Sequence, residues 1–273
     1  MIKEGMNMPT VVITGSTRGF GLEQAKEFKK AGFNVVLSGT SEKNLNAALE
    51  KVQAVCPGKS EVIGTICNVT DCEAVQRLWD TAKEKFGKVD IWINNAGVNQ
   101  PDKPVYELTD KEIEFMLDTD LKGTIYGSKT AFAGMKEQGE GQIFNVEGYG
   151  SNDAMMTGLT LYGTTKRAVT YFTQALAKES SDITNGAVKV GRLAPGIMLT
   201  DFLNTANGGN THFELPEKTK KVYSILGDYP ETIARYVVPR MITNKKNNAR
   251  IIWLTNRRAF VKFLTAGKNK KEL

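Results

Sequence analysis

Tyr162 and Lys166 are the pair of side chains best suited to acid–base chemistry in this sequence of 273 residues. Four positions separate them, so on a helix they lie on one face and their polar ends can converge. A tyrosine hydroxyl ordinarily loses its proton near pH 10, and a phenolate at neutral pH requires about 4 kcal/mol of stabilisation. One positive charge at about 4 Å supplies roughly that amount at an effective dielectric constant of about 20. Because such pairs also occur on solvated helix faces, the rest of the chain decides whether this one is catalytic.

A glycine-rich turn near the start of the chain provides that context. Residues 10–14 form a β-branched run, which is followed by Gly15, Gly19 and Gly21. A helical pattern with Leu22 and Phe28 on one face comes next. Glycines allow positive φ and let the backbone approach a pyrophosphate, whose charge is stabilised by the N-terminus of the following helix. A strand, a glycine turn and a helix in this order favour nucleotide binding.

The alternation of strand and helix continues along the chain. We expect further strands at 34–38, 61–67, 90–94, 142–146, 188–193 and 249–254, and helices at 42–55, 71–86, 109–135 and 161–178. This order predicts an α/β fold of the Rossmann type, a doubly wound parallel sheet of about seven strands with helices on both faces. Ligands of such sheets bind at the carboxyl ends of the strands. Because there is no linker and no internal repeat, residues 1–273 are predicted to form a single domain.

Composition argues against several other classes of protein. Hydrophobic residues make up 41% and charged residues 24% of the chain, and no apolar run reaches the roughly 18 residues that span a bilayer. The three cysteines form no CxxC pair, and the N-terminus has no secretory pattern, so we expect a reducing, cytoplasmic location. The single histidine, His212, provides no metal-ligand set and leaves any Ser-His-Asp triad dependent on that one residue. The net charge of +6 is spread along the chain, so we expect no nucleic-acid partner.

Four motifs occur in the order typical of a known family: TGSTRGFG at 14–21, NNAG at 94–97, YGTTK at 162–166, and Pro195-Gly196 followed by Thr200. Together they resemble the short-chain dehydrogenase/reductase family over essentially the whole chain. The resemblance implies a seven-stranded Rossmann-type sheet and a nicotinamide dinucleotide as cofactor. It also implies that Tyr162 exchanges the proton, while Lys166 contacts the nicotinamide ribose and lowers the pKa of the tyrosine.

The same resemblance assigns the residues that contact the cofactor. Asn95, Ala96 and Gly97 would border the adenosine ribose, and Pro195, Gly196 and Ile197 the nicotinamide. The complete predicted set is Gly15, Thr17, Arg18, Gly19, Phe20, Gly21, Thr40, Asn68, Val69, Asn95, Ala96, Gly97, Tyr162, Lys166, Pro195, Gly196, Ile197 and Thr200.

The second predicted strand bears on the choice between NADP(H) and NAD(H). An acidic residue at its end would bind the ribose 2′-hydroxyl of NAD and repel a 2′-phosphate. Residues 37–41 contain no acid, and Arg18 offers a guanidinium group suited to a phosphate. We therefore favour NADP(H), with NAD(H) as the alternative.

Three positions depart from the family pattern. Asp120 replaces an asparagine that helps to hold a proton-relay water, and Asn68 stands where an aspartate is frequent. The serine expected about thirteen residues before the tyrosine is missing, because Gly148 and Tyr149 occupy that place. Ser151, Tyr149 or a backbone amide could replace its hydroxyl. If nothing replaces this hydroxyl, the rate would fall by about two to three orders of magnitude. The alternative function is therefore a catalytically weak or inactive protein that senses a nucleotide or acts as a scaffold.

Two segments, 143–151 and 230–241, are similar to those of chlorophyll(ide) b reductases, which reduce a ring formyl group to a hydroxymethyl group with a reduced nicotinamide cofactor. Ser151 matches a serine of that subgroup, whereas Asp120 does not match its asparagine. The predicted function is an NADP(H)-dependent reductase that converts a carbonyl to an alcohol. Tyr162, Lys166, Ser151 and Asp120 are its candidate catalytic residues.

Two regions outside the alternating pattern remain. Residues 200–230 are either a substrate lid or a plain surface excursion, and 256–273 form a basic C-terminal extension. Residues 257–271 could contact a membrane as an amphipathic helix, although a helix docked on the protein is favoured. The family resemblance also implies a homodimer or homotetramer.

Overall fold

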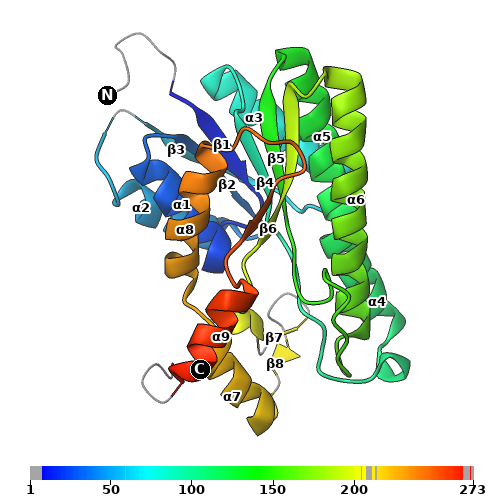
Figure 1. Ribbon diagram of the computed structural model, residues 1–273. Coiled ribbons are helices and arrows are strands. Elements are labelled where there is room, and N and C mark those ends of the chain that lie inside the picture. Colours follow the sequence, from blue (N-terminus) through cyan, green and yellow to red (C-terminus); the bar gives the residue numbers. More distant parts are fainter. Residues whose placement is uncertain are drawn as a thin grey trace.

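A parallel sheet at the centre of the molecule positions the site. The computed structural model describes residues 8–58, 60–203, 205–206, 211–212, 214–266 and 271 (Figure 1). The strands of the sheet are β1 (Thr10–Ile13), β2 (Asn34–Gly39), β3 (Val62–Ile66), β4 (Ile91–Asn94), β5 (Gly141–Val146), β6 (Val188–Ala194) and β9 (Arg250–Ile252). Their order is β3-β2-β1-β4-β5-β6-β9, and every neighbouring pair is parallel. The predicted seven-stranded, doubly wound sheet is confirmed.

The order of the strands reverses between β1 and β4, which are neighbours in the sheet although two strands separate them along the chain. Ligands of doubly wound sheets bind at this switch point, beyond the carboxyl ends of the strands. β1, β2 and β4 are buried along their whole length. Burial on both faces explains why their sequences are nearly continuous apolar runs.

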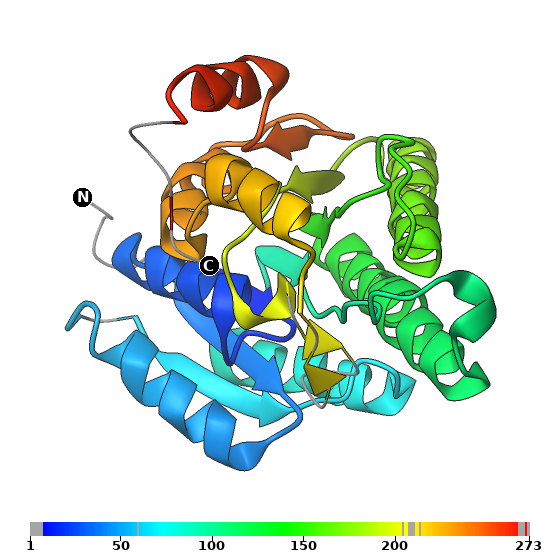
Figure 2. The same ribbon diagram turned by 90° about the horizontal axis from the view of Figure 1, so that it is seen from below.

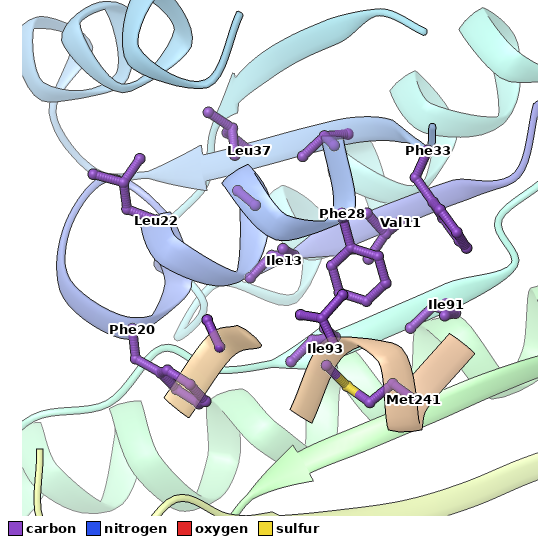
Figure 3. Close-up of a cluster of buried hydrophobic side chains, with 14 of the residues drawn as sticks. Val11, Ile13, Phe20, Leu22, Phe28, Phe33, Leu37, Ile91, Ile93 and Met241 are labelled. Atoms are coloured by element: carbon purple, nitrogen blue, oxygen red, sulfur yellow. The ribbon is translucent and has the colours of Figure 1, made fainter. Parts of the chain in front are cut away.

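Helices cover both faces of the sheet (Figure 1). They are α1 (Gly19–Lys30), α2 (Glu42–Gln53), α3 (Cys72–Phe86), α4 (Asp110–Met116), α5 (Gly123–Gln138), α6 (Thr160–Thr184), α7 (Glu217–Leu226), α8 (Pro230–Ile242) and α9 (Asn256–Leu264). On one face α1, α2 and α8 bury a cluster in which Phe28, Ile13 and Met241 meet (Figure 3). On the other face α3, α5 and α6 bury a second cluster around Trp79 and Trp92.

The helix predicted at 109–135 is present but is not a uniform α-helix. A capping box of Thr109 and Glu112 starts α4, and a π-helical segment, η2 (Leu117–Lys122), separates α4 from α5. π-Helical turns often occur at functional sites. This one contains Asp120, whose side chain is completely buried.

The segment after β6 departs from the alternating pattern, as predicted for 200–230. It contains a short 3-10 turn, η3 (Asp201–Leu203), an antiparallel pair of strands, β7 (Thr205–Ala206) and β8 (Thr211–His212), and helix α7. Seen from below, this segment lies over the carboxyl end of the sheet (Figure 2). Residues 204, 207–210 and 213 lie outside the described part of the chain.

The C-terminal extension begins with α9, which lies beside α7 (Figure 1). Polar contacts attach it to the rest of the protein: Lys262 forms an ion pair with Asp228 at 2.8 Å, and the guanidinium of Arg258 stacks on Trp253. The apolar side chains of Phe260 and Leu264 are exposed. Within the extension, α9 is therefore a helix held by polar contacts, and no helix in the described ranges is long and apolar enough to cross a membrane.

Candidate active site

The glycine turn between β1 and α1 is held in shape by its neighbours. Gly15 has a φ of +60°, and a Cβ atom there would lie 2.8 Å from the Cα of Ala96, so only glycine fits. The side-chain amide of Asn95 donates to the carbonyl oxygens of Thr14 and Gly15 at 3.0 and 3.1 Å. Ser16 Oγ accepts from the amide of Ser38 at 2.9 Å. The turn is therefore fixed to both adjacent strands before any ligand arrives.

The N-terminus of α1 opens toward the space above this turn. Arg18, the residue before the helix, has an extended backbone, and the first turn carries no acidic side chain. The amide groups of that turn and the helix dipole are consequently available to an anion.

A cleft of about 700 Å³ lies at this end of the sheet. Of the predicted cofactor residues, all except Pro195, Gly196 and Ile197 line it, and Met198 lines it in their place. Further lining residues that the sequence did not single out are Gly39, Cys67, Val98, Phe115, Thr119, Val146, Glu147, Met198, Asp201 and Phe202. The cleft, its close-approach glycine and the helix N-terminus that lines it fit a nicotinamide dinucleotide, which residues 15–21 and 95–97 would hold.

Tyr162 and Lys166 lie together in the same cleft. The Nζ atom of Lys166 is 5.5 Å from the centre of the Tyr162 ring and 2.9 Å from Oδ2 of Asp120. Asp120 Oδ1 accepts from the backbone amide of Val98 at 2.7 Å. The phenol, the ammonium group and the carboxylate therefore form one buried cluster beside the nucleotide turn, an arrangement suited to proton transfer.

Comparison with known proteins agrees with this geometry. The family model for short chain dehydrogenases matches residues 9–210. The chain belongs to the short chain dehydrogenase family.

Relatives of this short chain dehydrogenase include two proteins from Oryza sativa subsp. japonica. The probable chlorophyll(ide) b reductase NYC1, chloroplastic, is 34% identical over 271 residues, which cover 94% of this chain and 52% of NYC1. The chlorophyll(ide) b reductase NOL, chloroplastic, is 33% identical over 260 residues, which cover 94% of this chain and 72% of NOL. The chain thus spans about half the length of NYC1.

The fold of the short chain dehydrogenase also resembles that of solved structures. The crystal structure of levodione reductase matches it with a TM-score of 0.80 at 24% sequence identity, covering 92% of this chain and 98% of that one. This likeness concerns the fold.

Ser151 is not placed as the short chain dehydrogenase pattern suggests for a substrate hydroxyl donor. Its Oγ donates to the carbonyl oxygen of Lys166 at 3.2 Å and accepts from the amide of Gly148 at 3.2 Å. Ser151 is buried and is not among the residues that line the cleft. Its hydroxyl instead fixes the loop after β5 against α6, because both of its hydrogen bonds go to backbone groups.

Gly148 occupies the position next to the Tyr162 hydroxyl. A Cβ atom on Gly148 would lie 2.4 Å from that hydroxyl and 2.9 Å from Cγ of Lys166. The tyrosine ring therefore fills the space that a side chain at 148 would need. This explains why the family serine cannot simply be restored there.

Lys166 acts to lower the pKa of Tyr162, as expected, but its effect does not determine the net direction. Burial raises the pKa of Tyr162 to about 12, and although the charge of Lys166 acts to lower it, the charge of Asp120 opposes that effect. Burial by itself lowers the pKa of Lys166, but the charges of Asp120 and Tyr162 and the contact with the Asp120 carboxylate together outweigh it, so the net direction is upward. Burial also raises the pKa of Asp120, whereas Lys166 and the amide of Val98 act to lower it. The two charges of the Lys166–Asp120 pair act in opposite directions on the phenol.

Sequence reasoning missed Gln100. Helix α6 has no local side-chain cap at its N-terminus, yet Oε1 of Gln100 accepts from the amides of Leu161 and Tyr162, both at 3.0 Å. Gln100 itself is fully buried. Its contact partners are about sixty positions away in the sequence, so no local pattern indicates this cap.

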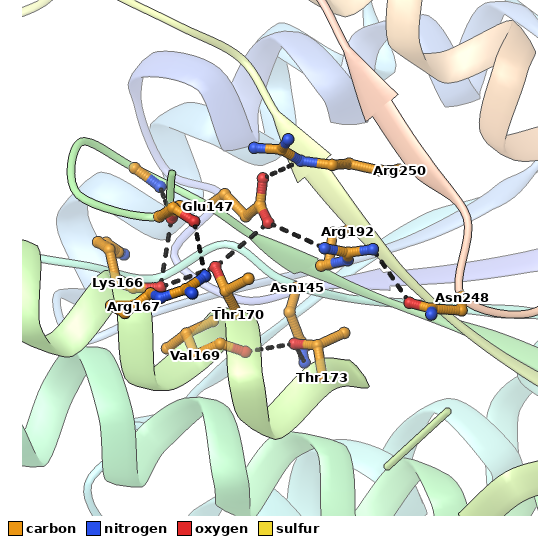
Figure 4. Close-up of polar contacts among 12 residues, drawn as sticks. Asn145, Glu147, Lys166, Arg167, Val169, Thr170, Thr173, Arg192, Asn248 and Arg250 are labelled. Atoms are coloured by element: carbon orange, nitrogen blue, oxygen red, sulfur yellow. Dashed lines mark hydrogen bonds and ion pairs between the residues drawn. The ribbon is translucent and has the colours of Figure 1, made fainter. Parts of the chain in front are cut away.

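Glu147 was also not singled out. It is buried at the end of β5, where Oε2 accepts from Arg250 Nε at 2.7 Å and Oε1 accepts from Thr170 Oγ1 at 3.2 Å (Figure 4). Arg192 lies 3.7 Å from the same carboxylate and donates to Asn248. This carboxylate joins β5, β6, β9 and α6 immediately before Gly148, and so fixes the backbone that lies next to Tyr162.

Proposed function

We propose that this short chain dehydrogenase is an NADP(H)-dependent reductase that converts an aldehyde or ketone to an alcohol. The observation that carries the proposal is the presence of Tyr162, Lys166 and the glycine turn in a single cleft. The bound nicotinamide cofactor supplies the hydride. Tyr162 donates the proton to the carbonyl oxygen, since the phenol is protonated at neutral pH. Lys166 places a positive charge beside the phenol, and Asp120 fixes the position of that ammonium group.

The preference for NADP(H) over NAD(H) is supported by the end of β2. Gly39 and Thr40 line the cleft there together with Arg18, and no acidic residue stands in this part of the strand to repel a 2′-phosphate. Replacement of Arg18 by alanine should raise the KM for NADPH about tenfold or more and leave that for NADH nearly unchanged. Equal effects on both cofactors would contradict the assignment.

We propose a large apolar carbonyl compound, such as one bearing a formyl group, as the substrate. The relatives named chlorophyll(ide) b reductase support this class. Phe115, Met198 and Phe202 provide apolar surface in the cleft, and Phe202 contacts the Tyr162 ring edge-on at 6.1 Å between ring centres. The Ser151 hydroxyl and the Gly148 amide bond to each other. Our candidate for the hydrogen bond to the substrate oxygen is therefore Tyr149, which is half-exposed on the same loop but, like Ser151, is not among the residues that line the cleft.

A second candidate function is that of a nucleotide-sensing or scaffold protein with weak or no turnover. The observation that favours it is the Ser151 hydroxyl, which bonds to the backbone of α6. Tight NADPH binding without NADPH consumption across a broad panel of aldehydes and ketones would support this function.

The experiment that tests the main proposal compares wild type with the Tyr162→Phe variant. NADPH consumption is measured against the carbonyl panel, and NADPH binding is measured separately by fluorescence. We expect turnover to fall by at least about two orders of magnitude while the Kd for NADPH changes little, because only the proton donor is lost. Retained turnover in the variant would remove Tyr162 as the acid.

We also propose that the protein forms a homodimer or homotetramer through the outer faces of α5 and α6. Tyr171 and Ile183 are large exposed side chains on α6. Sedimentation analysis of a Tyr171→Glu variant should show dissociation, since a charge at a packed contact is costly. An unchanged mass would place the contact elsewhere.

A further inference from the structure

Asp120 occupies a position at which its charge acts directly on the catalytic pair. Its side chain is fully buried in the π-helical segment η2. One carboxylate oxygen accepts from the amide of Val98 at 2.7 Å, and the other lies 2.9 Å from Nζ of Lys166. The backbone of Gly97 closes a third side, because a Cβ atom there would lie 3.5 Å from both carboxylate oxygens. The carboxylate cannot turn away from Lys166 without losing a buried hydrogen bond.

Within the described ranges, few charged or titratable groups act on the phenol. Lys166 on α6 favours the phenolate, whereas Asp120 on η2 and Tyr223 on α7 disfavour it. The nearby Glu147 is bound by Arg250, Arg192 and Thr170. Burial has the largest effect on the pKa of the phenol, and among the charged groups Lys166 and Asp120 act on it in opposite directions.

We propose that Asp120 is a positioning residue that offsets the charge of Lys166 and so raises the pH at which the Tyr162 phenolate forms. A neutral side chain at this place would leave the ammonium charge uncompensated, and the phenolate would form at lower pH. In reduction the tyrosine must carry a proton to give, whereas in alcohol oxidation the phenolate must accept one. This inference rests on the proposed role of Tyr162 as the acid.

The direct test is a titration of Tyr162 in the Asp120→Asn variant, which replaces the carboxylate by an amide of the same shape. Tyrosine labelled with ¹³C at the carbon that bears the hydroxyl reports phenolate formation by NMR, and the Tyr162→Phe variant assigns the signal. Removal of one charge at several ångströms should lower the midpoint by about one to two pH units. An unchanged or higher midpoint would overturn the proposal.

A matched control is available two positions away. Asp118 lies in the same segment, and its half-exposed carboxylate pairs with Lys122 at 3.1 Å. The Asp118→Asn variant should leave the Tyr162 midpoint unchanged. An equal shift in both variants would mean that neutralisation anywhere on η2 is sufficient, which contradicts the role assigned to Asp120.

A second variant and a kinetic measurement complete the test. If Asp120→Asn does not fold, Asp120→Ser removes the same charge with a smaller side chain and should give the same shift. For the folded variant, the pH profile of alcohol oxidation should rise about one to two pH units earlier than in wild type. A lower rate with an unshifted profile would indicate a structural role and refute the proposal. Because the NMR titration requires no turnover, failure of the proposed function would not be mistaken for failure of this inference.

Discussion

The contact between Gly148 and Tyr162 provides a sharp test of the site. In the Gly148→Ala variant a methyl group is added at a backbone position from which Cβ would lie 2.4 Å from the Tyr162 hydroxyl. The closest approach expected for an ordinary van der Waals contact is 3.4 Å. The hydroxyl must therefore move by about 1 Å, or the loop after β5 must shift by a similar distance.

This displacement determines the expected loss of activity. A misplacement of about 1 Å at a reacting group can cost about 100-fold in rate. The loop cannot readily absorb the strain, because Ser151 and Glu147 fix it to α6, β6 and β9. We therefore expect kcat to fall by about 100-fold and the stability to fall by about 1–3 kcal/mol, as in other overpacked sites.

The assay measures kcat and KM for reduction with NADPH on a carbonyl that wild type accepts, together with NADPH binding. Gly163→Ala is the matched control: it makes the same change one residue from Tyr162, where the added Cβ would have only the Cα of Gly150 at 3.7 Å. That variant should keep wild-type kcat. Since alanine is the better helix former, it should also unfold at a slightly higher urea concentration.

Two results would refute the reasoning. If the Gly148→Ala variant keeps the wild-type kcat, the reaction does not require the Tyr162 hydroxyl to lie where the structure places it. A loss of NADPH binding as large as the loss of kcat would show that the loop supports the nucleotide rather than the proton donor.

Three other predictions follow from buried polar groups. Glu147→Gln should destabilise the protein by about 3–5 kcal/mol in urea unfolding, because Arg192 and Arg250 lose their charged partner. The control is Glu217→Gln at the exposed pair with Lys220, which should change stability by less than about 1 kcal/mol. Gln100→Ala should lower kcat more than it lowers the affinity for NADPH, since two amides at the start of α6 lose their acceptor. Equal losses of kcat and NADPH affinity would be inconsistent with a role of Gln100 in positioning Tyr162. Burial acts to raise the pKa of Asp228, but contacts from Lys262, Lys271 and Trp253 outweigh it and hold that pKa below its ordinary value. The stability that these contacts give the folded protein is present above the unfolded pKa of about 3.9. It is lost as the pH falls through the lower folded pKa. Trp253 fluorescence should report an acid transition that is absent from Asp228→Asn.

The sequence by itself determined the order and the kind of the elements. Every predicted strand of the sheet is present within two residues at each end, because β-branched runs and glycine turns are local signals. The shared face of Tyr162 and Lys166 follows from helical periodicity alone. The family motifs then indicated a nicotinamide dinucleotide, and the turn that carries the first motif lies in the cleft.

Only the tertiary structure decided how the side chains at the site pair. Ser151 lies close enough in sequence to suggest a substrate contact, yet the path of its loop directs the hydroxyl to the backbone of α6. Asp120 meets Lys166, and Gln100 reaches the start of α6, from positions more than forty residues away. Spacing along the chain encodes periodicity within one element, whereas such pairings depend on how separate elements pack, which only the folded structure supplies.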